Sequence, residues 1–141
     1  MGRPRARELT ERELQVMHVF WNRGEAAGPA GVAEVREALG VSGLDLAYTT
    51  VATLVRILDE KGFLEQANDE RPFLYRPARS YEDVSRRLLG DMLERVFRGS
   101  RELLLVRLME QERLTARERA LLRGMLDGKE PRPGGKEGRT P

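Results

Sequence analysis

The stretch AYTTVATLVRILDEKGFL, residues 47–64, places an amphipathic helix directly before an extended segment. Its large apolar residues recur at the spacing of one helical face: Val51, Leu54, Val55 and Leu58. Apolar residues at i, i+3, i+4 and i+7 predict a helix over residues 47–61 with one buried face. Gly62 is expected to end this helix, because glycine readily adopts the left-handed conformation common after helix C-termini.

Two helical patterns precede this stretch. Residues 10–13, Thr-Glu-Arg-Glu, are typical of a capping box, and the apolar stripe after them predicts a helix over residues 10–23. A shorter helix is predicted over residues 30–39 and is expected to end at Gly40. The segment between them contains Pro29 and two glycines and is predicted to be a linker.

A hairpin is predicted after the helix over residues 47–61. Two short extended runs, residues 63–66 and 73–76, flank the polar turn at residues 68–72. Pro77 is expected to close the second run. The order of three helices and a two-stranded wing predicts a winged helix-turn-helix domain over residues 10–78.

The rest of the chain is predicted to be mainly helical. Ser80 is expected to cap a helix whose apolar stripe is broken at Gly99. Residues 103–109 (LLLVRLM) predict a short apolar helix, and a second capping box at residues 115–118 starts another. The fold class is therefore mainly α with a small β-hairpin wing: an N-terminal winged helix-turn-helix domain and a C-terminal three-helix region.

The two ends of the chain are predicted to be irregular. Residues 1–9 form a basic arm with Arg3, Arg5 and Arg7, which could add salt-sensitive phosphate contacts or simply be solvated. Residues 128–141 combine glycine, proline and charge, so a disordered tail is expected there.

The helices within residues 79–127 carry more large apolar side chains than one small helical layer can bury. We therefore expect a dimerisation domain in which two copies share one core. The alternative is that this apolar face packs back on the chain's own N-terminal domain. The predicted interface residues are Leu88, Leu89, Met92, Leu93, Val96, Phe97, Leu104, Leu105, Leu108 and Met109.

The outer face of the helix over residues 47–61 is a candidate DNA-binding surface. Threonine and arginine side chains can read base edges in the major groove, and hydroxyls and first-turn amides suit phosphate oxygens. The alternative is a solvated face in which the threonines cap the helix. An arginine at the wing tip could contact phosphate or a narrow minor groove. The predicted DNA-binding residues are Tyr48, Thr49, Thr50, Thr53, Arg56 and Arg71.

Composition narrows the function classes. The 141-residue chain has no cysteine and one histidine, which excludes disulfides, thiol catalysis, and cysteine-based or multi-histidine metal sites. It also lacks a serine-centred glycine elbow and a phosphate-binding glycine loop, so we expect no enzyme, cofactor or small-molecule ligand. The absence of a long apolar run or signal core predicts a cytoplasmic protein. With a net charge of only +2, nucleic acid would have to bind through a local patch.

Four segments carry a family resemblance: LTERELQVMHVFWNRG, VAEVREAL, LAYTTVATLVRILDEKGFL and FLYRPARS. Together they resemble the penicillinase-repressor family, the bacterial repressors of β-lactamase and methicillin-resistance genes and their copper-responsive relatives. The resemblance covers about residues 9–127. It implies a homodimeric repressor that binds an inverted-repeat promoter operator, with the outer face of residues 47–61 in the major groove.

The resemblance also implies a route of release. Members of the family are often paired with a membrane sensor metallopeptidase, which leads to cleavage within the dimerisation helices. The cleaved Asn-Phe bond of the resistance repressors matches Arg107-Leu108 in this sequence. Because the residues differ, the resemblance alone does not decide whether this chain is cleaved there. The copper-responsive branch has a C-terminal cysteine cluster, which this chain lacks. The alternative from another class is a winged-helix protein-interaction adaptor without specific DNA binding.

Overall fold

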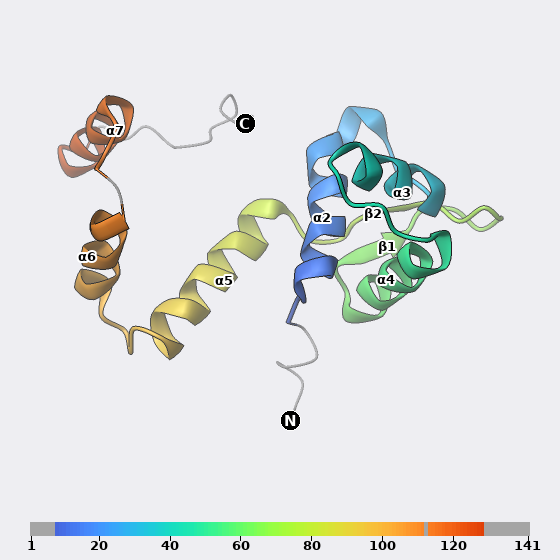
Figure 1. The fold of residues 1–141 in the computed structure, drawn as a ribbon, viewed down its shortest axis with the longest axis horizontal. Coiled ribbons are helices and arrows are strands. Elements are labelled where there is room, and N and C mark those ends of the chain that lie inside the picture. Colours follow the sequence, from blue (N-terminus) through green and yellow to red (C-terminus); the bar gives the residue numbers. More distant parts are fainter. Residues whose placement is uncertain (1–7, 112, 129–141) are drawn as a thin grey trace. The chain divides into compact units, whose positions relative to one another are not determined.

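The computed structural model describes residues 8–111 and 113–128, so the predictions for residues 1–7 and 129–141 lie outside it. The chain is mainly helical with one small antiparallel sheet (Figure 1). The elements are α2 (Glu11–Arg23), the 3-10 turn η1 (Glu25–Ala27), α3 (Val32–Val41), α4 (Tyr48–Lys61), β1 (Leu64–Gln66), β2 (Tyr75–Pro77), α5 (Tyr81–Arg95), α6 (Arg101–Gln111) and α7 (Ala116–Leu126). They form two compact units, one up to Leu88 and one from Leu89.

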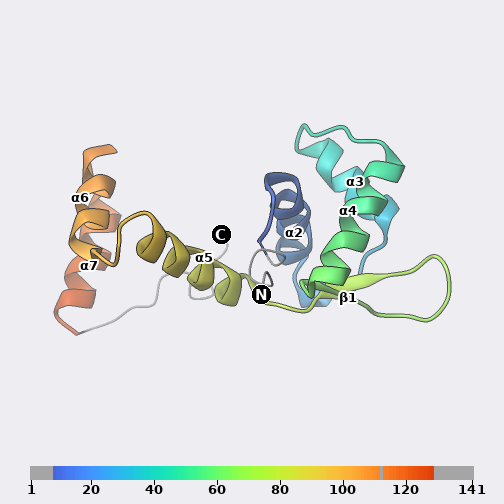
Figure 2. The same cartoon turned by 90° about the horizontal axis from the view of Figure 1, so that it is seen from below.

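The first unit has a single hydrophobic core between α2, α3, α4 and the hairpin (Figure 2). As the helical spacing predicts, Val51, Val55 and Leu58 of α4 are buried, and Leu54 packs against them. These residues meet Val16 and Met17 of α2 across the core. The winged helix-turn-helix arrangement predicted from the sequence is confirmed.

Helix boundaries follow the predicted caps closely. Thr10 and Glu13 form the expected capping box at the start of α2, with Glu13 N donating to Thr10 Oγ1 over 3.2 Å. The prediction that the second helix ends at Gly40 is wrong, because α3 continues to Val41. Gly40 is part of the helix, and Gly43, with φ +99°, is the glycine that takes the left-handed backbone of the following turn.

The hairpin, which we call the wing, pairs Leu64 with Pro77, Glu65 with Arg76 and Gln66 with Tyr75. Its second strand was expected over residues 73–76 but begins at Tyr75. The reason is that Leu74 N donates to the side-chain Oδ1 of Asn68 over 2.8 Å instead of entering the strand ladder. Tyr75 also exchanges two backbone hydrogen bonds with Ala30, which ties the wing to the segment before α3.

The start of α5 belongs to the first unit. Val84 is buried in its core. Trp21 of α2 donates its indole N–H to the carbonyl of Arg79 over 3.0 Å, and its ring lies edge-on to that of Tyr81 with centroids 5.3 Å apart. His18 completes this aromatic cluster at 5.4 Å from Trp21. The entry into α5 is therefore fixed to α2.

The second unit consists of the end of α5 with α6 and α7. The short apolar helix predicted over residues 103–109 is longer at both ends, since α6 extends from Arg101 to Gln111. Its earlier start is fixed by Ser100, whose Oγ accepts from Leu103 N. Thr115 and Glu118 form the second predicted capping box. In the part of the chain that the structure describes, neither α6 nor α7 has a buried residue.

Candidate nucleic-acid interface

The outer face of α4 presents the polar residues predicted from the sequence. All five are exposed to solvent: Tyr48, Thr49, Thr50, Thr53 and Arg56. The opposite face of the same helix is fixed in the core by Val51, Val55 and Leu58. This helix therefore offers a small, hydrogen-bonding surface on a rigid support.

The N-terminus of α4 has no side-chain cap. Its N-cap residue is Ala47, so the expectation that threonines might cap this helix is wrong: Thr49 and Thr50 lie inside the first turn. Among the described residues, α3 likewise begins at a residue without a capping side chain, Gly31, although Glu34 accepts from the Gly31 N–H. In the remaining α-helices a hydroxyl before the first turn accepts a first-turn N–H; these hydroxyls belong to Thr10, Ser80, Ser100 and Thr115. The first-turn amides of α4 are consequently left for solvent or for an anion, which the helix dipole favours at this end.

Arg56 pairs with an acid on its own helix. Its Nη1 atom lies 3.0 Å from Oε2 of Glu60, and both side chains are more than half exposed. An exposed pair at i, i+4 contributes only a few tenths of a kcal/mol. The guanidinium can therefore exchange this partner for a phosphate or a guanine edge at little cost.

Contacts at both ends of α4 hold it in place. Before the helix, Arg36 Nε donates to the carbonyl of Leu46 over 2.9 Å and fixes the turn from α3. After it, Gly62 adopts the left-handed conformation with φ +88°, as predicted. Lys61, in the last turn, lies 2.7 Å from the buried carboxylate of Glu13 on α2.

The wing carries the remaining predicted DNA-binding residue. Arg71 is exposed in the β1–β2 loop, and its guanidinium lies over the ring of Phe73, 5.2 Å from the centroid. The neighbouring Asp69 and Glu70 are also exposed. In Figure 1 this loop projects away from the helices of the first unit. The tip of the wing, residues 69–71, therefore presents one cation beside two acids.

One titratable group at the base of the wing is perturbed. Burial, and secondarily the negative charge of Asp59 on α4, raise the pKa of the Tyr75 phenol. The side chain is half-buried and packs against the core. The backbone of Tyr75 joins β2 to Ala30, in the segment before α3.

The predicted dimerisation residues are largely exposed in the single chain. Leu88, Leu89, Met92, Val96, Leu105, Leu108 and Met109 are exposed, and Leu93, Phe97 and Leu104 are half-buried. Leu105 has 57% of its surface exposed. Such an accumulation of exposed apolar surface is unusual for a chain that stays alone in water.

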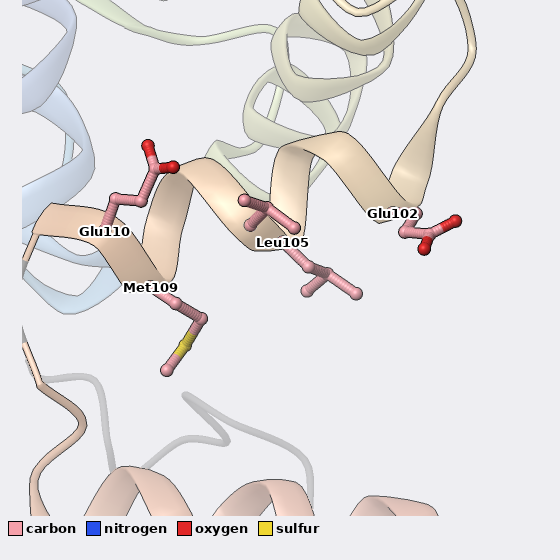
Figure 3. Close-up of a pocket in the computed structure, with 5 residues that line it drawn as sticks. Glu102, Leu105, Met109 and Glu110 are labelled. Carbon is pink, nitrogen blue, oxygen red and sulfur yellow. The ribbon is translucent and has the colours of Figure 1, made fainter.

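The predicted interface residues leave out two parts of this surface. Leu105, Val106 and Met109 of α6 line a shallow apolar hollow between Glu102 and Glu110 (Figure 3), and Val106 was not among the predicted residues. Leu122, Met125 and Leu126 of α7 are also exposed. The signal was present in the sequence, since Leu105, Val106 and Met109 have the spacing of one helical face.

Arg107 and Leu108, the predicted cleavage position, lie within α6. Both side chains are more than half exposed, and Arg107 Nη1 lies 3.4 Å from Glu110. The peptide bond between them is part of the regular helix from Arg101 to Gln111. A protease that cuts here would have to unwind this helix locally.

Other kinds of site have little support. Within residues 8–111 and 113–128, no group of three or more acidic, histidine or cysteine side chains could hold a metal ion. Over the same residues, no helix is both long enough and apolar enough to cross a bilayer. The α4 face, the wing tip and the apolar face of the second unit remain as the candidate functional surfaces.

The sequence is similar to those of known proteins. A family model described as penicillinase repressor matches residues 9–128. Transcriptional regulator BlaI of Mycobacterium tuberculosis is 36% identical over 104 residues, which cover 73% of this chain and 72% of that protein. Methicillin resistance regulatory protein MecI of Mammaliicoccus sciuri is 25% identical over 122 residues, covering 86% and 95% of the two chains.

A solved structure shows a weaker likeness. It is the homodimeric winged helix-turn-helix DNA-binding domain of Mb0332 from Mycobacterium bovis, with a TM-score of 0.41 and 23% identity. The match covers 59% of this chain and 70% of that one.

Proposed function

The chain belongs to the penicillinase repressor family, and from this premise we propose that it is a transcriptional repressor that binds an inverted-repeat operator as a homodimer. The observation that carries the proposal is the α4 helix, which combines a buried apolar face with an exposed threonine and arginine face. The related proteins BlaI and MecI are named as regulators of transcription and of methicillin resistance. Neither name implies an enzyme.

We propose that α4 lies in the major groove of DNA. Its uncapped first-turn amides suit phosphate oxygens, and the hydroxyls of Thr49, Thr50 and Thr53 suit phosphates and base edges. Arg56 is the one basic residue of this face and would leave Glu60 for a guanine or a phosphate. Tyr48 at the start of the helix and Arg71 on the wing would extend the contact on either side.

Dimerisation follows from the second unit. The exposed apolar residues of α5, α6 and α7 would be covered by the same residues of a second copy. A two-fold dimer places two α4 helices on half-sites about one DNA turn apart, roughly 34 Å, or a multiple of it. The second half-site then binds at a high effective concentration, so that the dimer occupies the operator far better than one domain alone.

We also propose that release follows the loss of this dimer. Cleavage between Arg107 and Leu108 would divide α6, whose apolar hollow lies on the proposed interface. The protease, or the protein that leads to its action, would be a membrane sensor metallopeptidase with a bond preference other than Asn-Phe. Incubation with the isolated sensor domain, followed by mass spectrometry of the fragments, identifies the bond.

The main experiment is the selection of bound duplexes from random DNA at near-physiological salt. An enriched inverted repeat is the expected result, and its half-site spacing reports the geometry of the dimer. Weak, salt-labile binding without enrichment would overturn the proposal. It would favour the adaptor function instead, with residues 48–56 as a protein-docking face.

A further inference from the structure

The side chain of Asn68 organises the loop that forms the tip of the wing. Its Oδ1 atom accepts from Leu74 N over 2.8 Å. Its Nδ2 atom donates to the carbonyls of Glu70, at 2.9 Å, and Pro72, at 3.1 Å. One amide group therefore satisfies backbone groups at three places around the loop.

Two of these contacts flank a single residue. Glu70 and Pro72 are the neighbours of Arg71, so the backbone on both sides of this arginine is held by the same Nδ2 atom. The loop is closed below Asn68 by the bond from Ala67 N to Leu74 O, at 2.7 Å. Gln66 Nε2 adds a further contact by donating to the backbone carbonyl of Asn68 over 2.7 Å.

The Arg71 side chain is directed by a further contact. Its guanidinium lies over the Phe73 ring, 5.2 Å from the centroid, while the residue as a whole stays exposed. A long side chain that is already ordered before binding loses less conformational entropy when it meets its partner. Because Asp69 and Glu70 lie beside it, the position of this one cation decides whether DNA meets attraction or repulsion at the tip of the wing.

We propose that Asn68 is a positioning residue for DNA binding, which acts by holding Arg71 where it contacts the phosphate backbone or the minor groove. The inference rests on the proposed function, since it assigns a role within the same interface. It predicts that removal of the Asn68 side-chain amide abolishes the contact of Arg71 with DNA and leaves α4 unaltered.

The test is a double-mutant cycle on the full-length chain, with the duplex enriched by the wild-type protein as the probe. Arg71→Ala should weaken binding roughly fivefold or more and lower the slope of log affinity against log salt by about 1. Asn68→Ala should produce the same two changes. The double variant should bind no more weakly than Arg71→Ala alone, because the two residues act as one unit.

Alanine is the appropriate replacement, since Asn68→Asp would add a negative charge that repels DNA for an unrelated reason. The control is Asn22→Ala, the same change at an exposed site on α2, which should bind as the wild type does. Backbone hydrogen exchange should be faster at Leu74 in Asn68→Ala and unchanged in Arg71→Ala, because only the first variant loses the acceptor Oδ1. Thermal unfolding of both variants establishes that the helical core is intact.

The results separate this inference from the proposed function. The positioning role is wrong, while DNA binding stands, if Asn68→Ala keeps the wild-type affinity and salt slope. It is also wrong if the affinity lost in the double variant equals the sum of the losses in Asn68→Ala and Arg71→Ala. The same holds if Arg71→Ala alone binds as the wild type does. If the wild-type chain enriches no duplex at all, the proposed function fails first.

Discussion

Lys61 Nζ lies 2.7 Å from Oε1 of Glu13, and it also donates to the backbone carbonyl of Glu8 over 2.7 Å. The Glu13 side chain is only 5% exposed and that of Lys61 19%. The pair joins the last turn of α4 to the first turn of α2, where Glu13 also accepts from Thr10 N. It therefore secures the C-terminal end of the proposed DNA-reading helix.

Removing the ammonium group of Lys61 should destabilise the first unit. Lys61→Met keeps the aliphatic stem but leaves a buried carboxylate unpaired, so we expect a loss of about 3 kcal/mol in the free energy of unfolding. Arg76→Met, which breaks the exposed pair with Glu65, should cost less than about 1 kcal/mol. Urea unfolding at a fixed protein concentration measures both.

A second variant tests the cause. Glu13→Gln in the Lys61→Met background removes the unpaired charge and should recover part of the loss. If Lys61→Met and Arg76→Met lower the free energy of unfolding equally, burial does not make the Lys61–Glu13 pair more important for stability than an exposed pair.

The raised pKa of Tyr75 predicts a loss of stability in alkali. Below the ordinary tyrosine pKa of about 10, the phenol is protonated in both the folded and the unfolded chain. Above it the unfolded chain releases the proton first, so stability falls as the pH rises towards the pKa of the folded state. Tyr75→Phe should flatten this part of the pH profile of the free energy of unfolding, and an unchanged slope would contradict the burial argument.

Arg56 and Glu60 can be separated by their effects on DNA. Arg56→Ala should cost about 1–3 kcal/mol of binding free energy on the enriched duplex, because it removes the one basic contact of the α4 face. Glu60→Gln breaks the same ion pair but keeps the arginine, and should bind equally well or more tightly. Binding titrations at two salt concentrations distinguish the variants; equal weakening by both would assign the effect to the ion pair.

The apolar hollow on α6 should be needed for dimerisation. Leu105→Glu places a charge among the residues that line it, and the side chain is already exposed in the single chain, so the fold should persist while the dimer dissociates. Gln111→Glu adds a charge elsewhere on the same helix and should leave the dimer intact. Sedimentation velocity measures the mass of each of the two variants. A dimeric Leu105→Glu variant would exclude the apolar hollow of α6 as the interface.

The elements built on regular periodicity were predictable from the sequence. The buried face of α4 follows from its i, i+3, i+4, i+7 spacing, and the starts of α2 and α7 follow from the Thr10 and Thr115 capping boxes. For α2 and α4 the local pattern and the tertiary packing favour the same structure, whereas α7, which has no buried residue, begins where the local pattern alone predicts.

The wrong boundaries occur where a side chain outside the periodic pattern determines the backbone conformation. Asn68 accepts a hydrogen bond from Leu74 N and shortens β2, and the spacing of apolar residues does not reveal this hydrogen bond. Gly40 lies in the last turn of α3, because Ser42 N donates to the carbonyl of Ala38 over 3.3 Å and the Ser42 hydroxyl donates to the carbonyl of Leu39 over 2.9 Å, which continues the helix to Val41.

The candidate site was predictable in composition but not in all its parts. The exposed residues of the α4 face follow directly from knowing which face is buried. The uncapped helix start is visible at Ala47 only once the helix boundary is known. The role of these residues in binding DNA, and of the second unit in forming a dimer, remain predictions for the experiments above.

The contact between Trp21 and the start of α5 has a practical consequence. Trp21 is the only tryptophan of the chain, and it joins α2 to Arg79 and Tyr81 through its indole N–H and its ring. The protein therefore contains an intrinsic fluorophore at the point where the chain leaves the winged helix-turn-helix core for α5. Any event that moves this junction changes the environment of this one tryptophan, so its emission can be followed in real time without an attached dye.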